Sequence, residues 1–269
     1  MSRTNIDSNE RTLLDLNEYE FYYFMPDSES VKNELGYFLK NNSIETYSYV
    51  TPTAFGEENF DQFLNFAFSY FQDGNTYFIV KHFNNDNYMV NSKKLRQRKF
   101  IPYHLDTSLM VWDGDEKDIP KPNSLVELEK LNSSNLVKWV DVFFDSFSYP
   151  NHLKKYIIRM VTTQEKNGIE FYVGNVRGKA VSCFCSYKSG SFYGIYGVGT
   201  RIKFRRRGYA RTMMINYVRE TLEKNLSAKF CLQAQRKTGA EQLYLNIGFR
   251  IAYLQKRFDW DPSTSASKF

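Results

Sequence analysis

The chain has 269 residues, of which 42% are hydrophobic and 17% aromatic, and its formal net charge is +6. This composition argues against a disordered chain, and the absence of any apolar run of about 18 residues argues against a membrane-spanning helix. The polar, acidic segment 1–20 does not have the pattern of a signal peptide. The cysteines, Cys183, Cys185 and Cys231, are too few for a disulfide framework, which predicts a cytoplasmic protein with buried free thiols.

Charge is divided unevenly along the chain. Residues 1–122 hold 12 Lys and Arg against 19 Asp and Glu, whereas residues 123–269 hold 24 against 11. The segment 113–123 is polar and contains two prolines, which is typical of a linker and predicts a domain boundary near Pro122. A basic second half suits nucleic acid, a membrane surface or a phosphorylated cofactor, so the placement of the charges must decide.

The first half has the elements of a partial α/β domain. Hydrophobic periodicity predicts helices over 58–71 and 88–98, and strands over 77–83 and 100–112. Segments 95–113 and 243–261 both pass from a helix end to a Phe, then a strand, then Trp-Asp. This similarity predicts that the first half is a degenerate copy of the second.

The second half predicts a mixed α/β domain. Its expected elements are strand 124–131, helix 133–147, helix 152–164, strands 169–176, 181–187 and 192–200, helix 209–224, strand 229–234, helix 239–246 and strand 249–258. Ser133 or Ser134 is the expected cap of the first helix. Tight turns at Gly178 and Gly190 predict that the three consecutive strands are antiparallel, whereas the later strand–helix–strand unit should be parallel.

A basic, glycine-containing turn follows the strand that ends near Thr200. Gly208 and Ala210 open the next helix, and small residues there let the backbone approach a ligand closely. The first turn of a helix has amides without intrahelical partners and carries partial positive charge. Four arginines surround it: Arg205, Arg206, Arg207 and Arg211. The pattern predicts a site for an anion such as a pyrophosphate.

The alternatives are two other phosphate-binding loops and a basic turn without a ligand. Neither the Walker sequence nor the Rossmann glycine fingerprint is present. A solvated basic helix start without any ligand stays open on spacing alone, because basic clusters are often only surface charge.

The pattern R-x-x-G-x-A in Arg205–Ala210 resembles the acetyl-CoA signature of the GCN5-related N-acetyltransferases (GNAT superfamily), whose usual form is Q/R-x-x-G-x-G/A. Downstream, Leu243–Phe249 resembles the L-Y-x-x-x-G-F element of that family, with a helix and a strand between the two elements. The resemblance covers about residues 124–260, and Ile202 stands where the family often has proline.

The resemblance implies a GNAT-like acyl-CoA transferase fold of α/β class, with a catalytic domain over 123–269 and a degenerate GNAT-like domain over 1–122. It implies acetyl-CoA as cosubstrate, no metal, and direct transfer of the acetyl group to an amine in a ternary complex. The implied cofactor-binding residues are Val198, Gly199, Thr200, Arg205, Arg206, Arg207, Gly208, Tyr209, Ala210, Arg211, Thr212 and Lys237. Strand residues 198–200 would meet the pantetheine arm, amides of 206–211 the pyrophosphate, and Lys237 the adenine end.

By the same resemblance, Tyr244 is the expected general acid. A phenol, with a pKa of about 10, can donate a proton to the departing thiolate. The alternative is an aromatic ring that only packs beside Phe249. A general base is not evident, because Glu170, Tyr193 and Tyr196 are more typical of structural residues. A water chain could remove the proton instead.

The first functional prediction is an N-acetyltransferase acting on a small-molecule or peptide amine. The alternative is a non-catalytic acyl-CoA-binding or regulatory module of the same fold. Nucleic acid and membrane partners are not expected, because the arginines gather at one helix start rather than along a face with interleaved aromatics. Acidic residues of the first half could attract a cationic amine, against the alternative of a solvated surface; the candidates are Asp106, Asp113, Asp115 and Glu116.

Overall fold

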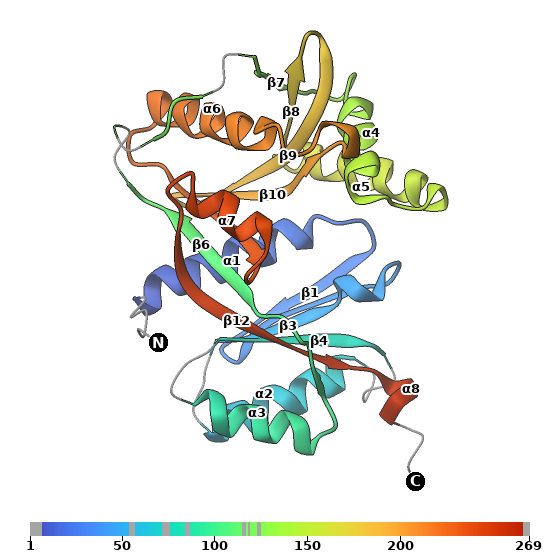
Figure 1. Cartoon of the computed structure of the whole chain (residues 1–269). Helices are drawn as coiled ribbons and strands as arrows, with labels where there is room; N and C mark the ends of the chain where they lie inside the picture. Colours follow the sequence, from blue (N-terminus) through green and yellow to red (C-terminus); the bar gives the residue numbers. More distant parts are fainter. Residues whose placement is uncertain are drawn as a thin grey trace. The chain divides into compact units, whose positions relative to one another are not determined.

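The computed structural model describes residues 7–53, 57–71, 76–83, 87–114, 117, 119–122 and 125–265. The chain, coloured by sequence in Figure 1, forms two compact units. Unit 1 comprises Met1–Leu109, Ala234–Arg236 and Ile251–Phe269, and unit 2 comprises Met110–Gln233 and Lys237–Arg250. The chain thus passes from unit 1 to unit 2 after Leu109, ahead of the linker expected near Pro122, and its last strand returns to unit 1.

Unit 1 is built on an antiparallel meander that continues into a parallel pair. Its elements are α1 (Ser8–Tyr23), β1 (Ser28–Lys32), β2 (Gly36–Asn41), η1 (Glu45–Tyr47), β3 (Tyr49–Pro52), α2 (Glu57–Tyr70), β4 (Phe78–Phe83), α3 (Tyr88–Gln97), β5 (Ile101–Pro102), the start of β6 (Thr107–Trp112), β12 (Arg250–Trp260) from Ile251 onward, and α8 (Pro262–Ser265). Strands β1, β2 and β3 are antiparallel, β3 and β4 are parallel, and β12 runs antiparallel to both β4 and β5.

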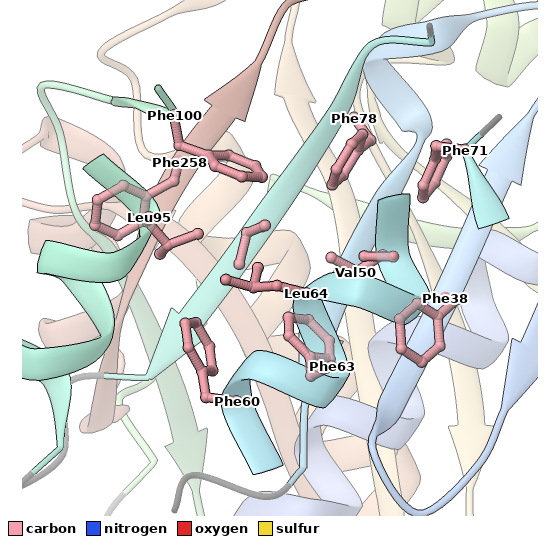
Figure 2. Close-up of a cluster of buried hydrophobic side chains, with 12 residues drawn as sticks. Phe38, Val50, Phe60, Phe63, Leu64, Phe71, Phe78, Leu95, Phe100 and Phe258 are labelled. Carbon is pink, nitrogen blue, oxygen red and sulfur yellow. The ribbon is translucent and has the colours of Figure 1, made fainter. Parts of the chain in front are cut away.

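The two faces of the unit 1 sheet carry different cores. Alternate residues of a strand point to opposite faces, and on β4 Val80 faces a phenylalanine-rich core whereas Ile79 faces α1. Figure 2 shows the first core, in which Phe60, Phe63 and other residues of α2 and α3 pack on the sheet. The second core lies between α1 and the sheet and includes tyrosines as well as Ile79.

Unit 2 contains the elements predicted for the second half except the last strand, 249–258, which is β12 and lies almost entirely in unit 1. They are β7 (Glu127–Lys130), α4 (Val137–Phe147), η3 (Asn151–Leu153), α5 (Lys154–Lys166), β8 (Glu170–Val176), β9 (Lys179–Ser189), β10 (Phe192–Thr200), η4 (Ile202–Phe204), α6 (Tyr209–Lys224), β11 (Lys229–Gln235) up to Gln233, and α7 (Gly239–Leu245). Strands β7 to β10 are antiparallel and β10 is parallel to β11, so the predicted strand directions are confirmed.

Helices α4 and α6 cover opposite faces of the unit 2 sheet. Trp139 of α4 packs edge-on against Phe171, whereas Tyr217 of α6 lies against the neighbouring Tyr172, whose side chain points to the other face. The indole of Trp139 also donates a hydrogen bond to the carbonyl of Phe184 at 2.8 Å. The cysteines are free and buried, as the sequence predicted.

Two local predictions were wrong. Helix α4 begins at Val137 after Leu136 and has no side-chain cap, because the Ser134 hydroxyl bonds instead to Asn132 at 2.6 Å. The strand expected over 100–112 is interrupted between β5 and β6.

Each half of the chain supplies the same order of elements. Strands β1–β3, helix α2, β4, α3 and β6 in the first half parallel β8–β10, α6, β11, α7 and β12 in the second. The final strands are exchanged: β12 pairs with β4 in unit 1, whereas the end of β6 belongs to unit 2, where Trp112 contacts Phe230 of β11 edge-on. This order supports the proposal that the halves are copies. None of the helices among the described residues has the length and apolar character needed to cross a membrane.

Candidate functional site

Strand β10 contains a bulge shortly before its end. Tyr196 pairs with Cys185 and Gly199 with Cys183, so three steps along β10 match two steps along β9. Gly197 lies within the bulge. Its φ of +62° is a left-handed conformation that glycine adopts without strain. A bulge of this kind bends the strand and redirects the residues that follow it.

The parallel pairing of β10 with β11 ends just before the bulge. The last pair is Ile195 with Leu232. In the continuous described range 125–265, residues Val198, Gly199 and Thr200 therefore follow the end of this ladder, on the edge that faced β11. A ligand with amide groups can add to such an edge as a strand does. These are the residues predicted to meet a pantetheine arm.

Helix α6 begins directly after the loop that follows β10. Gly208 is its N-cap in a left-handed conformation with φ of +74°, and it provides no side-chain cap. The first intrahelical bond runs from the Thr212 amide to the Gly208 carbonyl at 2.9 Å, so the amides of Tyr209, Ala210 and Arg211 precede it and have no intrahelical acceptor. A Cβ at Gly208 would meet no atom within 4 Å, so the space beside this helix start is open.

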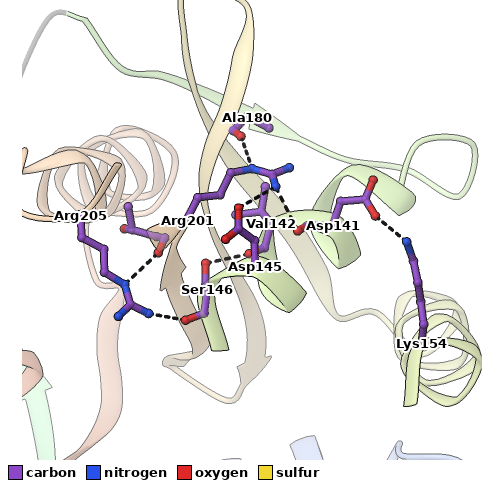
Figure 3. A network of polar contacts seen from close by, with 9 residues as sticks. Asp141, Val142, Asp145, Ser146, Lys154, Ala180, Arg201 and Arg205 are labelled. Carbon is purple, nitrogen blue, oxygen red and sulfur yellow. Dashed lines mark hydrogen bonds and ion pairs between the residues drawn. The ribbon is translucent and has the colours of Figure 1, made fainter. Parts of the chain in front are cut away.

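Two arginines tie the loop to α4, as Figure 3 shows. Arg205 donates to the carbonyl of Ser146 and, at 3.3 Å, to that of Thr200. Arg201 donates to the carbonyl of Ala180 at 2.9 Å and pairs with Asp145 at 3.1 Å. The Arg205 guanidinium is thus engaged by the protein, and Arg201 was missed in the sequence because nothing local reveals its partners.

The other predicted arginines leave positive charge around the open helix start. Arg206 and Arg207 are exposed and Arg211 is half-buried. The Arg207 guanidinium lies 5.7 Å from the centroid of the Phe204 ring, and the Lys179 ammonium lies 5.2 Å from the same centroid. No acidic residue stands in the first turn of α6. The charge and the free amides together favour an anion.

Helix α4 approaches the bulge so closely that only glycine fits there. A Cβ at Gly199 would lie 2.8 Å from the Cβ of Ser146, and one at Gly197 would lie 3.2 Å from the Trp139 ring. Phe143 stacks on Trp139 with centroids 4.4 Å apart, which completes an aromatic wall behind the strand. Gly199 therefore has a packing reason besides its predicted contact with the cofactor.

Tyr244 is buried on α7. Its side chain is 5% exposed, and its ring lies 6.1 Å, centroid to centroid, from that of Phe249. Burial raises the pKa of the Tyr244 phenol well above its ordinary value, which keeps the hydroxyl protonated at neutral pH. No hydrogen-bond partner for this hydroxyl is found among the described residues. The packing beside Phe249 and a proton-donating role are both compatible with this arrangement.

Thr212 and Lys237 occupy different surroundings. Thr212 is only 2% exposed, so its hydroxyl lies inside unit 2. Lys237 is exposed, with a φ of +61°, and its backbone amide donates to the Glu241 carboxylate at 2.8 Å. Thr238 then caps α7 by accepting from the Glu241 amide at 3.4 Å. The Lys237 side chain is therefore carried at the exposed start of α7.

The structure gives the other polar candidates internal partners. Glu170 pairs with Lys130 and accepts from the Tyr172 hydroxyl at 2.6 Å. The Tyr193 ring lies 5.7 Å from that of Phe230. Burial raises the pKa of the Cys183 and Cys185 thiols well above the ordinary range, which makes them poor nucleophiles.

Two of the acidic candidates for attracting a cationic substrate are already ion-paired. Asp106 pairs with Lys256 in unit 1, and Asp113 pairs with Arg250 at 2.6 Å in unit 2. The hydrogen bond from Arg250 lowers the pKa of Asp113. Asp115 and Glu116 lie outside the described residues.

Comparison with known proteins gives structural similarity at low sequence identity. No protein-family model matches the chain, and no curated protein matches its sequence. The chain is similar to a GCN5-related N-acetyltransferase from Kribbella flavida, with 13% identity, 93% of this chain and 95% of that chain covered, and a TM-score of 0.67. It is also similar to a tandem GNAT protein from the clavulanic acid biosynthesis pathway, with 7% identity, coverage of 94% and 96%, and a TM-score of 0.63.

A conserved protein of unknown function from Staphylococcus epidermidis matches as well, with 15% identity, coverage of 87% and 94%, and a TM-score of 0.60. At these identities the likeness concerns the fold alone. The chain has the mixed α/β fold of the GCN5-related N-acetyltransferases, in agreement with the fold predicted from Arg205–Ala210 and Leu243–Phe249.

Proposed function

We propose that unit 2 binds acetyl-CoA and transfers its acetyl group to an amine. The observation that carries the proposal is the sequence of features along β10: the ladder with β11 ends at Ile195, a bulge follows, and an uncapped helix starts at Gly208. An unpaired strand edge suits the amides of a pantetheine arm, and free helix amides suit a pyrophosphate. Acetyl-CoA contains both groups in this order.

Different groups of unit 2 would stabilise the thioester oxygen and protonate the leaving sulfur. A backbone amide near Val198 stabilises the negative charge that develops on the thioester oxygen. The amine nitrogen forms a bond to the carbonyl carbon, the carbon–sulfur bond breaks, and Tyr244 gives its proton to the leaving sulfur. The extra proton that the attacking nitrogen carries after the carbon–nitrogen bond forms passes through water to the Tyr244 phenolate, which leaves a neutral amide and a neutral thiol. Burial raises the pKa of Tyr244, which keeps the phenol protonated until the sulfur leaves and also makes it a weaker acid.

The acceptor in this proposal is a primary amine of a small molecule or a peptide. The cosubstrate would be held without a metal. The second candidate is a module of the same fold that binds acyl-CoA without turnover. It is favoured by the internal engagement of Glu170, the carboxylate considered as a base from the sequence, which pairs with Lys130 and accepts from Tyr172.

Thiol release separates these two candidates. Purified protein is incubated with acetyl-CoA and a panel of small amines and peptides with free N-termini, and free CoA thiol is measured over time while products are identified by mass spectrometry. We expect amine-dependent thiol release with an acetylated product. Acetyl-CoA binding by calorimetry without release on any amine would support the binding module, and absence of binding would contradict both.

A further inference from the structure

Unit 1 contains a counterpart of the place where β10 and β11 part. The parallel pairing of β3 with β4 ends at Val50 with Val80, as that of β10 with β11 ends at Ile195 with Leu232. Thr53 lies three residues beyond the last pair of β3, at the same remove as Val198 in β10. The first half therefore repeats the diverging strands that, in unit 2, are proposed to admit a pantetheine arm.

A side chain from α1 reaches the strand end in unit 1. Arg11 is 8% exposed, and its Nη2 donates to the carbonyl of Thr53 at 3.5 Å. The guanidinium also lies 5.2 Å from the centroid of the Phe83 ring, at the end of β4. Arg11 thus contacts both strands just beyond the point where their pairing ends, and it makes the kind of backbone contact that a bound pantetheine amide would make.

Buried carboxyl groups balance this arginine and a neighbouring lysine. Asp15, 5% exposed, lies 3.6 Å from the Nε of Arg11 and accepts a hydrogen bond from Tyr253. Glu18, 2% exposed, pairs with Lys81 of β4, and the Lys81 ammonium lies 3.6 Å from the centroid of the Tyr49 ring on β3. Two cations and two carboxyl groups therefore fill this region. A neutral ligand arm that entered it would have to separate these buried pairs, which is costly.

Two further residues of unit 1 differ from their counterparts in the binding turn of unit 2. Pro52 of β3 has no amide hydrogen to offer an added strand. Helix α2 has Glu58 at its second position, whereas α6 opens among arginines. Acidic groups at a helix start take up its positive end and repel a pyrophosphate.

We propose that Arg11, Asp15, Glu18 and Lys81 form an internal plug in the slot of unit 1, so that each chain binds one acyl-CoA, in unit 2. In the plug, side chains of the protein itself make the contacts to β3 and β4 beyond the end of their pairing. The stoichiometry rests on the proposed function of unit 2, whereas the closure of unit 1 does not.

Hydrogen exchange read by mass spectrometry tests the closure directly. The full chain is labelled with and without millimolar CoA, and peptides covering β3 and β4 are compared with peptides covering residues 196–212. We expect slower exchange in 196–212 and no change in β3 or β4. Protection of β3 or β4 by CoA would overturn the plug. Protection in neither region would leave unit 1 closed as proposed but would contradict the function of unit 2.

Native mass spectrometry of the same protein gives the stoichiometry. We expect one CoA per chain, and at least a tenfold loss of that binding in the variant Gly208→Ala. Two CoA per chain would overturn the proposal, and so would one CoA whose affinity is unchanged by Gly208→Ala, because that site would lie outside the α6 start.

Discussion

The hydroxyl of Tyr253 on β12 donates a hydrogen bond to the carboxyl group of Asp15 on α1, 238 positions earlier in the chain. Both side chains are buried. Because β12 also pairs with β4, the last strand of the chain completes the sheet of unit 1 and closes the polar cluster under α1. The C-terminal strand therefore helps to bury a titratable residue of unit 1.

We expect the variant Asp15→Asn to change how stability depends on pH. Burial raises the pKa of Asp15 from 3.8 to about 7, while Tyr253 and Arg11 oppose the shift. The folded protein thus binds this proton more tightly than the unfolded chain, so the contribution of Asp15 is fully present below pH 4 and is lost as pH rises through 7. Each pKa unit corresponds to about 1.4 kcal/mol.

Urea unfolding at pH 5 and pH 8 measures this effect. Asparagine cannot ionise, so the variant should gain stability relative to the natural protein between pH 5 and pH 8, by an amount on the order of 1–3 kcal/mol. Equal pH dependence of the two proteins would show that Asp15 does not titrate in this window.

Helix α1 illustrates why part of the fold escapes sequence reasoning. Its buried face carries Arg11, Asp15, Asn17 and Glu18, so hydrophobic residues do not recur with helical spacing and the helix was missed. The exchange of β6 and β12 was missed for a related reason, because strand pairing across the whole chain leaves no local signal. Strands β8, β9 and β10 were predicted because Gly178 and Gly190, both with positive φ, mark their turns.

One part of the candidate site could be predicted from the sequence and another could not. The helix start at Gly208 was predicted from local sequence, and glycine adopts the left-handed φ of +74° found there without strain. The engagement of Arg205 and Arg201 depends on carbonyls and a carboxylate of α4 and β9, and no spacing in the sequence indicates it.

Replacing Gly208 with alanine should weaken acetyl-CoA binding. Its φ of +74° disfavours any residue with a Cβ, so the N-cap must shift and the free amides of α6 lose their alignment. We expect KM for acetyl-CoA to rise about tenfold or more, equivalent to about 1.4 kcal/mol. Calorimetry of CoA binding provides the direct measurement.

Gly168→Ala is the matched control for that variant. Gly168 has a φ of +84° and, like Gly208, an added Cβ there would meet no atom within 4 Å. Both substitutions should lower stability by about 1 kcal/mol through backbone strain, but only Gly208→Ala should alter CoA binding. A similar loss of binding in Gly168→Ala would mean that general destabilisation explains both.

Gly199→Ala should destabilise unit 2 by overpacking. The new Cβ would lie 2.8 Å from the Cβ of Ser146 on α4, which is buried and has little room to move. Overpacking of this kind costs about 1–3 kcal/mol, measurable by urea unfolding. The second substitution Ser146→Gly removes the clashing atom and should restore part of the loss. Additive losses in the double variant would contradict direct contact between these positions.

Arg201→Met should loosen the loop that leads to α6. It removes the hydrogen bonds to the carbonyls of Ala180 and Asp141, at 2.9 and 3.3 Å, and the ion pair with Asp145. We expect a stability loss of about 1–3 kcal/mol from the lost charge-assisted hydrogen bonds, together with a higher KM for acetyl-CoA. Lys154→Met is the control, because it breaks only an exposed pair with Asp141 and should change stability by less than about 0.5 kcal/mol.

Tyr244→Phe should separate a chemical role from a packing role. The variant keeps the ring beside Phe249 and removes a hydroxyl for which the described residues provide no hydrogen-bond partner, so stability should be unchanged. If Tyr244 donates the proton to the leaving sulfur, kcat should fall about a hundredfold while KM for acetyl-CoA stays constant.

Tyr217→Phe is the control for that variant, because it should change stability and not turnover. The Tyr217 hydroxyl donates to Ser186 at 2.6 Å in the buried interior beneath α6, so its removal should lower stability by about 1 kcal/mol and leave kcat unchanged. Measuring unfolding and turnover for both variants therefore distinguishes the two tyrosines. An unchanged kcat in Tyr244→Phe would assign Tyr244 to packing alone, because the ring without its hydroxyl would then suffice for turnover.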